Sequence, residues 1–113
     1  MQGITEPRFN GFIERFCANP RAFTRDQLAE HYTLNALACL SQAMELINDA
    51  NALPAEFDYN MQRIACRLDA NLLVSMADGD IMGIEHMGGA YERNAKPIRS
   101  AYAFVNAWLA ATR

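Results

Sequence analysis

The fold is decided by the stretch TRDQLAEHYTLNALACLSQAMELINDA, which occupies residues 24–50. Thr24 and Gln27 have the spacing of a capping box, in which each side chain bonds to the other residue's backbone at the start of a helix. No proline or glycine follows before Pro54, so one helix can continue to about Ala50. Its apolar residues cover a wide arc, and we expect this helix to be central, with neighbours on two sides. They are Leu28, Tyr32, Leu37, Leu40, Met44 and Ile47, broadened by Leu34, Cys39, Ala43 and Leu46.

Three further segments repeat the 3.6-residue apolar period of an amphipathic helix. We expect helices over about Pro7–Ala18, Asp58–Ala77 and from Pro97 to the C-terminus, with Gly79 ending the middle one. Residues 79–91 hold four of the six glycines together with apolar side chains, and we expect a Gly- and Met-rich loop there, in the form of a packed loop, a short helical turn or a small extended segment. The apolar positions are Phe9, Phe12, Ile13 and Phe16 in the first segment, Met61, Ile64, Ala65, Leu68, Leu72, Leu73 and Met76 in the second, and Ile98, Ala101, Tyr102, Val105, Trp108 and Leu109 in the last.

These elements predict an all-α fold, a four-helix and mostly antiparallel bundle formed by residues 1–113 as a single domain. The long second helix would pack on the third and fourth, and the shorter first helix would close one side. The second and fourth helices carry more apolar surface than one bundle needs, which predicts a homodimer.

Charge and composition favour some classes of partner over others. The chain has 13 acidic and 10 basic residues, a net charge of −3, which disfavours binding to nucleic acid. We expect no signal peptide and, because no apolar run reaches the ~20 residues that a membrane span needs, a cytoplasmic protein. Cys17, Cys39 and Cys66 are widely spaced and form no CxxC pair, which indicates reduced structural thiols.

No catalytic, phosphate-binding or metal-binding motif is present, so we expect neither an enzyme nor a cofactor. The sequence predicts a non-enzymatic protein that acts by binding another protein, as an adaptor, regulator or inhibitor of the kind found among small bacterial or phage accessory factors. We expect the contact surface in the adaptable apolar loop and in the basic turn after it. Its residues would be Met82, Ile84, His86, Met87, Tyr91, Arg93, Lys96 and Arg99.

Two alternatives from other classes remain open. Thr24 to Ala43 resembles a degenerate helix-turn-helix, although no Lys or Arg occurs from Asn35 to Asp49, where contacts to DNA would be expected. A small-molecule or metal site could instead use His31, Glu85 and His86, but their spacing matches no metal-ligand pattern.

Overall fold

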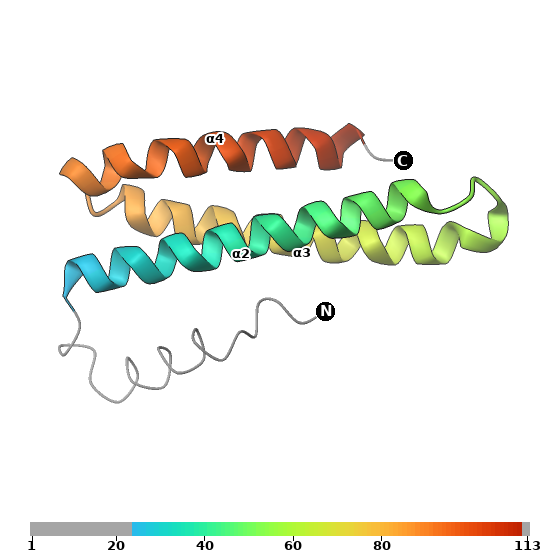
Figure 1. The fold of residues 1–113 in the computed structure, drawn as a ribbon, viewed down its shortest axis with the longest axis horizontal. Helices are drawn as coiled ribbons and strands as arrows, with labels where there is room; N and C mark the ends of the chain where they lie inside the picture. Colours follow the sequence, from blue (N-terminus) through green and yellow to red (C-terminus); the bar gives the residue numbers. More distant parts are fainter. Residues whose placement is uncertain (1–23, 112–113) are drawn as a thin grey trace, which may run out of the picture.

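Three long helices make up residues 24–111, the part of the chain that the computed structural model describes (Figure 1). They are α2 (Arg25–Ala52), α3 (Asn60–Glu85) and α4 (Gly89–Ala111), and a short 3₁₀ turn, η3 (Phe57–Tyr59), precedes α3. α2 and α4 run in the same direction and α3 runs antiparallel to both (Figure 1). These residues contain no strand, which confirms the all-α class.

Two predictions concern residues outside this range. The helix expected over Pro7–Ala18, which would complete the predicted four-helix bundle, lies outside the described residues, as does Cys17.

Within residues 24–111, no helix is both long and apolar enough to cross a membrane.

The start of α2 confirms the predicted capping box. The Thr24 hydroxyl accepts a hydrogen bond from the Gln27 backbone N–H at 3.1 Å, and the Thr24 N–H donates to Gln27 Oε1 at 3.0 Å. From there α2 continues through Thr33 without a turn, so residues 25–52 form one helix. The turn that a helix-turn-helix requires is therefore absent from α2.

The core lies where the three helices meet. α2 and α3 share the most extensive interface, and α4 packs on both of them. Small and branched side chains dominate this core, which lets the helix axes approach closely. Its most completely buried large side chains are Cys39, Ile47, Leu73, Ile81 and Val105.

The prediction of a loop over residues 79–91 is wrong, because α3 continues to Glu85. Leu73, Val74, Ala77, Ile81 and Ile84 are all buried, so the apolar period of the core face persists through both Gly79 and Gly83. Burying these side chains outweighs the helix-propensity cost of a glycine, about 1 kcal/mol each.

The last helix also begins earlier than predicted, at Gly89 instead of near Pro97. The turn before it is short, and Gly88 and Gly89 supply the positive φ angles of 74° and 55° that this turn needs. Ala95 and Ile98 are buried on either side of Pro97, and the proline itself faces solvent. Water can therefore satisfy the carbonyl that Pro97, lacking an N–H, leaves without a helical partner.

Candidate functional site

The most unusual surface of the molecule is an apolar stripe along the outer face of α3. We define the α3 stripe as Met61, Ile64, Leu68, Leu72 and Met82, whose exposed fractions lie between 44% and 74%. Their spacing follows the helical repeat closely, and the two positions that continue the series between Leu72 and Met82 hold the small residues Ser75 and Gly79. No charged residue interrupts the series over its length of about 32 Å.

This stripe lies on the side of α3 opposite the core. At 100° per residue, its positions are centred about half a turn from those of the buried Ala70, Leu73, Ala77 and Ile84. α3 is therefore apolar on two sides, one packed against α2 and α4 and one facing solvent. The sequence prediction placed Leu68, Leu72 and Leu73 on a single apolar side, whereas the structure buries Leu73 and exposes the other two.

Gly79 contributes to the shape of the stripe. A Cβ atom added at Gly79 would meet no atom within 4 Å, so packing inside the described chain does not require a glycine there. Gly83, one turn further, differs because an added Cβ would lie only 3.0 Å from the ring of Tyr32. The close contact between α2 and α3 thus explains the glycine at position 83. Gly79 instead leaves a shallow depression in the exposed apolar stripe.

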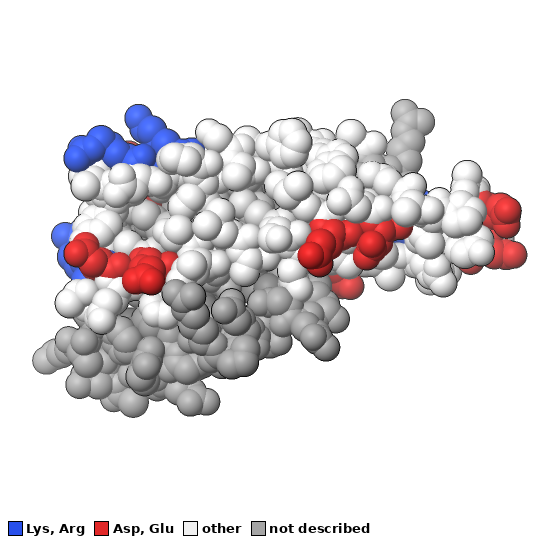
Figure 2. Space-filling model, in the orientation of Figure 1, with Lys and Arg blue, Asp and Glu red and all other residues white. Residues whose placement is uncertain are grey.

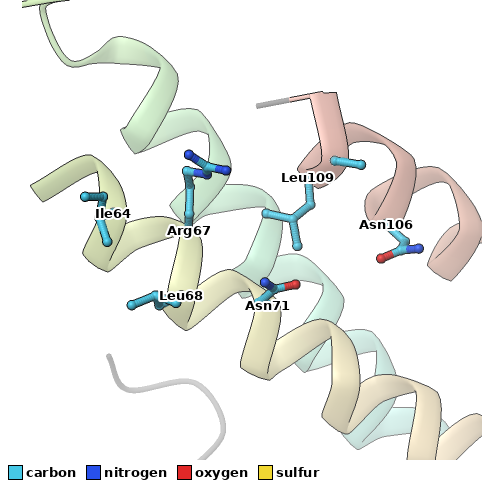
Figure 3. A pocket seen from close by; sticks show the side chains of 7 residues that line it. Ile64, Arg67, Leu68, Asn71, Asn106 and Leu109 are labelled. Carbon is cyan, nitrogen blue, oxygen red and sulfur yellow. The ribbon is translucent and has the colours of Figure 1, made fainter. Parts of the chain in front are cut away.

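A hollow of about 340 Å³ adjoins the stripe between α3 and α4 (Figure 3). Ile64 and Leu68 line it from α3, and Leu109 reaches toward α3 from the opposite helix (Figure 3). Its polar lining consists of Arg67, Asn71 and Asn106. A second hollow lies at the end of the bundle where α2 connects to α3. It shares Ile64 and Arg67 with the first hollow, so the two depressions adjoin each other.

The site residues predicted from the sequence fall into different environments instead of one loop. Ile84 belongs to the core and is 2% exposed, so it cannot contact a partner. Met82 lies on the α3 stripe, His86 is exposed at the C-terminal cap of α3, and Met87 is half-buried. Tyr91 is half-buried at the start of α4.

Met87 and Tyr91 take part in contacts that hold the α3–α4 turn against the first turn of α2. Arg25 donates a hydrogen bond to the Met87 carbonyl at 2.7 Å, and its guanidinium lies 5.2 Å from the centroid of the Tyr91 ring. The Tyr91 hydroxyl donates to Asp26, and this bond to a carboxylate raises the pKa of the phenol. The contacts are exposed, and they fix where the turn sits.

Arg99 is also committed to the fold. Its guanidinium donates to both carboxylate oxygens of Glu85, at 2.6 and 3.1 Å, and to Asp78 at 2.6 Å, while it lies 5.0 Å from the Tyr102 ring. Pairing with Arg99 lowers the pKa of Glu85, and the two carboxylates raise that of Arg99. Arg99 therefore joins α4 to the end of α3 and is not available as a free surface cation.

Arg93 and Lys96 remain as the exposed cations of the predicted basic cluster. Figure 2 shows Lys and Arg side chains gathered over the first half of α4, while acidic side chains lie elsewhere on the same face. No ion pair joins either residue to another residue of the 24–111 range. We call Arg93 and Lys96 the basic patch.

The residues that could carry chemistry do not converge on one site. Glu85 is bound by Arg99, and within residues 24–111 no three His, Cys, Asp or Glu side chains are grouped so that they could hold a metal ion. Burial raises the pKa of Asp80, which accepts a hydrogen bond from Asn35 in the α2–α3 interface. Burial and the nearby Asp80 raise the pKa of Cys39 to about 11, so this thiol stays protonated.

The exposure of the α3 stripe was missed in the sequence, although a signal for it exists. Arg67 and Asp69 lie at the two margins of the stripe, between the exposed and the buried apolar faces. Two apolar faces separated by charges predict a helix with contacts on both sides. The prediction counted one face because it ended the helix before Ile81 and Ile84 could mark the other.

Comparison with protein-family models, with curated protein sequences and with solved structures finds no match to this chain. The geometry of residues 24–111 therefore carries the functional argument.

Proposed function

We propose that this chain is a non-enzymatic helical protein that acts by binding a helical segment of a protein partner along the α3 stripe. The observation that carries the proposal is the exposure of five large apolar side chains on the side of α3 opposite the core. Contiguous apolar patches on soluble proteins usually mark interaction surfaces. Anchors repeated at three- and four-residue intervals are the pattern with which one amphipathic helix recognises another.

The stripe also has the energetic properties of a contact surface. Complete burial of a Leu, Ile or Met side chain contributes roughly 1.5–3 kcal/mol, so covering the middle of the stripe would stabilise a complex substantially. The neighbouring hollow offers Arg67, Asn71 and Asn106 as polar groups at its edge. An apolar centre with a polar margin is the usual composition of a specific interface.

The basic patch supplies a second contact, for an acidic surface of a protein partner. Arg93 and Lys96 are exposed and carry no ion pair to residues 24–111, so binding an acidic group there breaks no existing pair. Such charges mainly speed association and select the partner, because exposed pairs are screened by salt.

The experiment compares Leu68→Glu with Gln62→Glu, two exposed positions of α3 of which only the first lies on the stripe. Tagged chains are used to capture proteins from the native cell, and the captured proteins are identified by mass spectrometry. We expect Leu68→Glu to lose binding at the stripe and Gln62→Glu to retain it, with both variants keeping the helical circular dichroism of the wild type. Equal recovery of every captured protein by the two variants and the wild type would contradict the proposal.

The basic patch is tested separately by the double charge reversal Arg93→Glu and Lys96→Glu. Because Arg99 is left unchanged, its contacts with Glu85 and Asp78 persist and the fold is preserved. We expect slower association with an acidic partner and a weaker dependence of its affinity on salt. An unchanged salt dependence would show that the patch is not used.

A further inference from the structure

We infer that the occupant of the α3 stripe is α3 of a second copy of this chain, running antiparallel about a two-fold axis between Asn71 and Leu72. This inference rests on the proposed use of the stripe as a helix-binding surface and names the partner.

The sizes of the side chains along the stripe are complementary in that arrangement. The half before the axis holds three large residues (Met61, Ile64 and Leu68), whereas the half after it holds two large residues (Leu72 and Met82) and two small ones (Ser75 and Gly79). In an antiparallel pair, residues equally far from the axis meet, so Ile64 faces the partner's Gly79 and Leu68 faces the partner's Ser75. Met61 then faces the partner's Met82, a flexible pair that adapts to the remaining space.

Gly79 is the position that this arrangement explains. A glycine inside a helix costs about 1 kcal/mol relative to alanine. Neither its φ angle nor a neighbour within residues 24–111 requires it, since an added Cβ would meet nothing within 4 Å. Opposite Ile64 of a second copy, the missing side chain lets the two helices approach and receives the isoleucine.

The charges beside the stripe fit the same orientation. Arg67 and Asp78 are about 20° apart around α3, on the margin of the stripe nearer α4. In an antiparallel pair of helices this margin faces the same margin of the other copy, so Arg67 lies near the partner's Asp78. A parallel pair in register would instead place each stripe residue opposite its own copy, with Leu68 against Leu68 and Gly79 against Gly79, so the large and small residues would not be matched.

The area of the surface suits a dimer. Across the hollow from Ile64 and Leu68, α4 exposes Asn106 and Ala110, short side chains that permit close approach. Two helix widths over the length of the stripe give roughly 600 Å² per copy, close to the ~800 Å² that each partner contributes to a standard stable interface. Asn71 and Asn106, across the hollow between α3 and α4, would lie near the axis, where paired amides can fix register.

The apolar segment predicted over Pro7–Ala18 is the other occupant to consider. Twelve helical residues span about 18 Å, whereas the stripe spans about 32 Å, so this segment could cover little more than half of it. A second α3 matches the full length.

The first experiment measures association of the full chain by sedimentation equilibrium. We expect a dimer in the wild type and a dissociation constant at least about 100-fold higher in Leu68→Glu, because symmetry introduces each substitution twice. Gln62→Glu, exposed on α3 but off the stripe, is the control and should dimerise as the wild type does. A wild type that stays monomeric at all concentrations, or a dimer that Leu68→Glu leaves unchanged, would overturn the inference.

The second experiment tests the orientation with cysteines and a short bis-maleimide linker, in full chains that carry Cys17→Ser and Cys66→Ser. Cys39 is buried and stays as it is. Leu72→Cys, next to the axis, should cross-link with itself, and Ile64→Cys should cross-link with Gly79→Cys but not with itself. Efficient self-cross-linking of Ile64→Cys would indicate a parallel pair and overturn the antiparallel arrangement.

The two proposals fail in different ways. A monomeric wild type whose capture of another protein is abolished by Leu68→Glu would refute the dimer and keep the proposed use of the stripe. If Leu68→Glu alters neither self-association nor capture, both proposals are wrong.

Discussion

At the scale of single residues, the least expected feature is a polar pair inside the α2–α3 interface. Asn35 is the one polar residue that residues 24–111 bury almost completely, and its side-chain amide donates to the Asp80 carboxylate. Burial of a charge is costly unless it is compensated, and one amide compensates only in part. The pair therefore fixes how α2 is placed on α3, and it lowers stability when Asp80 is ionised.

The pKa of Asp80 leads to a prediction about pH. Because burial raises this pKa in the folded state, the folded protein binds a proton more tightly at Asp80 than the unfolded chain does. The contribution of Asp80 to stability is thus complete below the unfolded pKa, about 3.9, and is lost as pH rises through the raised folded value. Asp80→Asn removes this loss, so we expect its free energy of unfolding, relative to the wild type, to increase between acidic and neutral pH.

Urea unfolding of both proteins over a pH series measures that difference. Other titrating groups, including Glu85, are common to the two proteins and largely cancel. A difference that stays constant or falls with rising pH would contradict the assigned role of Asp80.

Arg99 gives a second prediction at this scale. Arg99→Ala removes bonds to Glu85 and Asp78 and should lower the free energy of unfolding by about 1 kcal/mol at neutral pH, a modest value because the three groups are about one-third exposed. Arg99→Lys, which cannot bond both oxygens of Glu85 in the same way, should lose part of this. Lys96→Ala, an exposed position of the same helix, is the control for lost charge.

The effect of Arg99→Ala should depend on pH. Arg99 lowers the folded pKa of Glu85, so the stability from this pair is present above the unfolded pKa of about 4.3 and disappears as pH falls through the lower folded value. Thermal unfolding of the two proteins at neutral pH and at about pH 3 checks this. A stability deficit of equal size at both values would show that the ion pair is not its cause.

At the scale of helices, the two glycines inside α3 are expected to respond differently to substitution. Gly79→Ala adds a methyl group into open space and should stabilise the folded monomer by up to about 1 kcal/mol. Gly83→Ala gains the same propensity but places its Cβ 3.0 Å from the Tyr32 ring, so it should be clearly less stable than Gly79→Ala. Chemical denaturation of the two variants at low protein concentration provides the comparison, and equal stabilities would contradict it.

The helices also show how far the sequence predicts this fold. The start of α2 follows from local chemistry, since Thr24 and Gln27 determine the cap without tertiary help. The end of α3 and the start of α4 do not, because Gly79 and Pro97 are ordinary helix breakers. The helices continue through Gly79 and Pro97 because the nearby Ile81 and Ala95 are buried in the core. Which residues are buried depends on how the three helices pack, so local sequence does not reveal it.

The candidate site could be predicted only in part, for the same reason. Arg93 and Lys96 are exposed, as the predicted basic contact surface needs. Ile84, predicted to contact a partner, is instead in the core, and Arg99 is bound to Glu85 and Asp78. Periodicity identified the stripe residues Leu68 and Leu72 as one apolar side. It could not show that the core uses the opposite side, because the position of α2 and α4 around α3 decides that.

At the scale of the whole molecule, the three helices should differ in local stability. α2 and α3 share the largest interface, and α4 packs on the outside of this pair with Pro97 interrupting its hydrogen bonds. We expect the slowest amide hydrogen exchange in the middle of α2 and α3, around Cys39 and Leu73, and faster exchange along α4. Exchange monitored by mass spectrometry measures this directly, and protection of α4 equal to that of α2 would contradict the order.

The direction of the helices has a mechanical consequence. Because α2 and α4 run the same way, residue 24 and residue 111 lie at opposite ends of the bundle (Figure 1). A force applied between these two points acts along the helix axes and loads the α2–α3 and α3–α4 interfaces in shear. Rows of interlocked side chains must then slide past one another together instead of separating one turn at a time. The bundle should therefore resist tension between these points better than a two-helix hairpin, whose ends lie together and can be peeled apart.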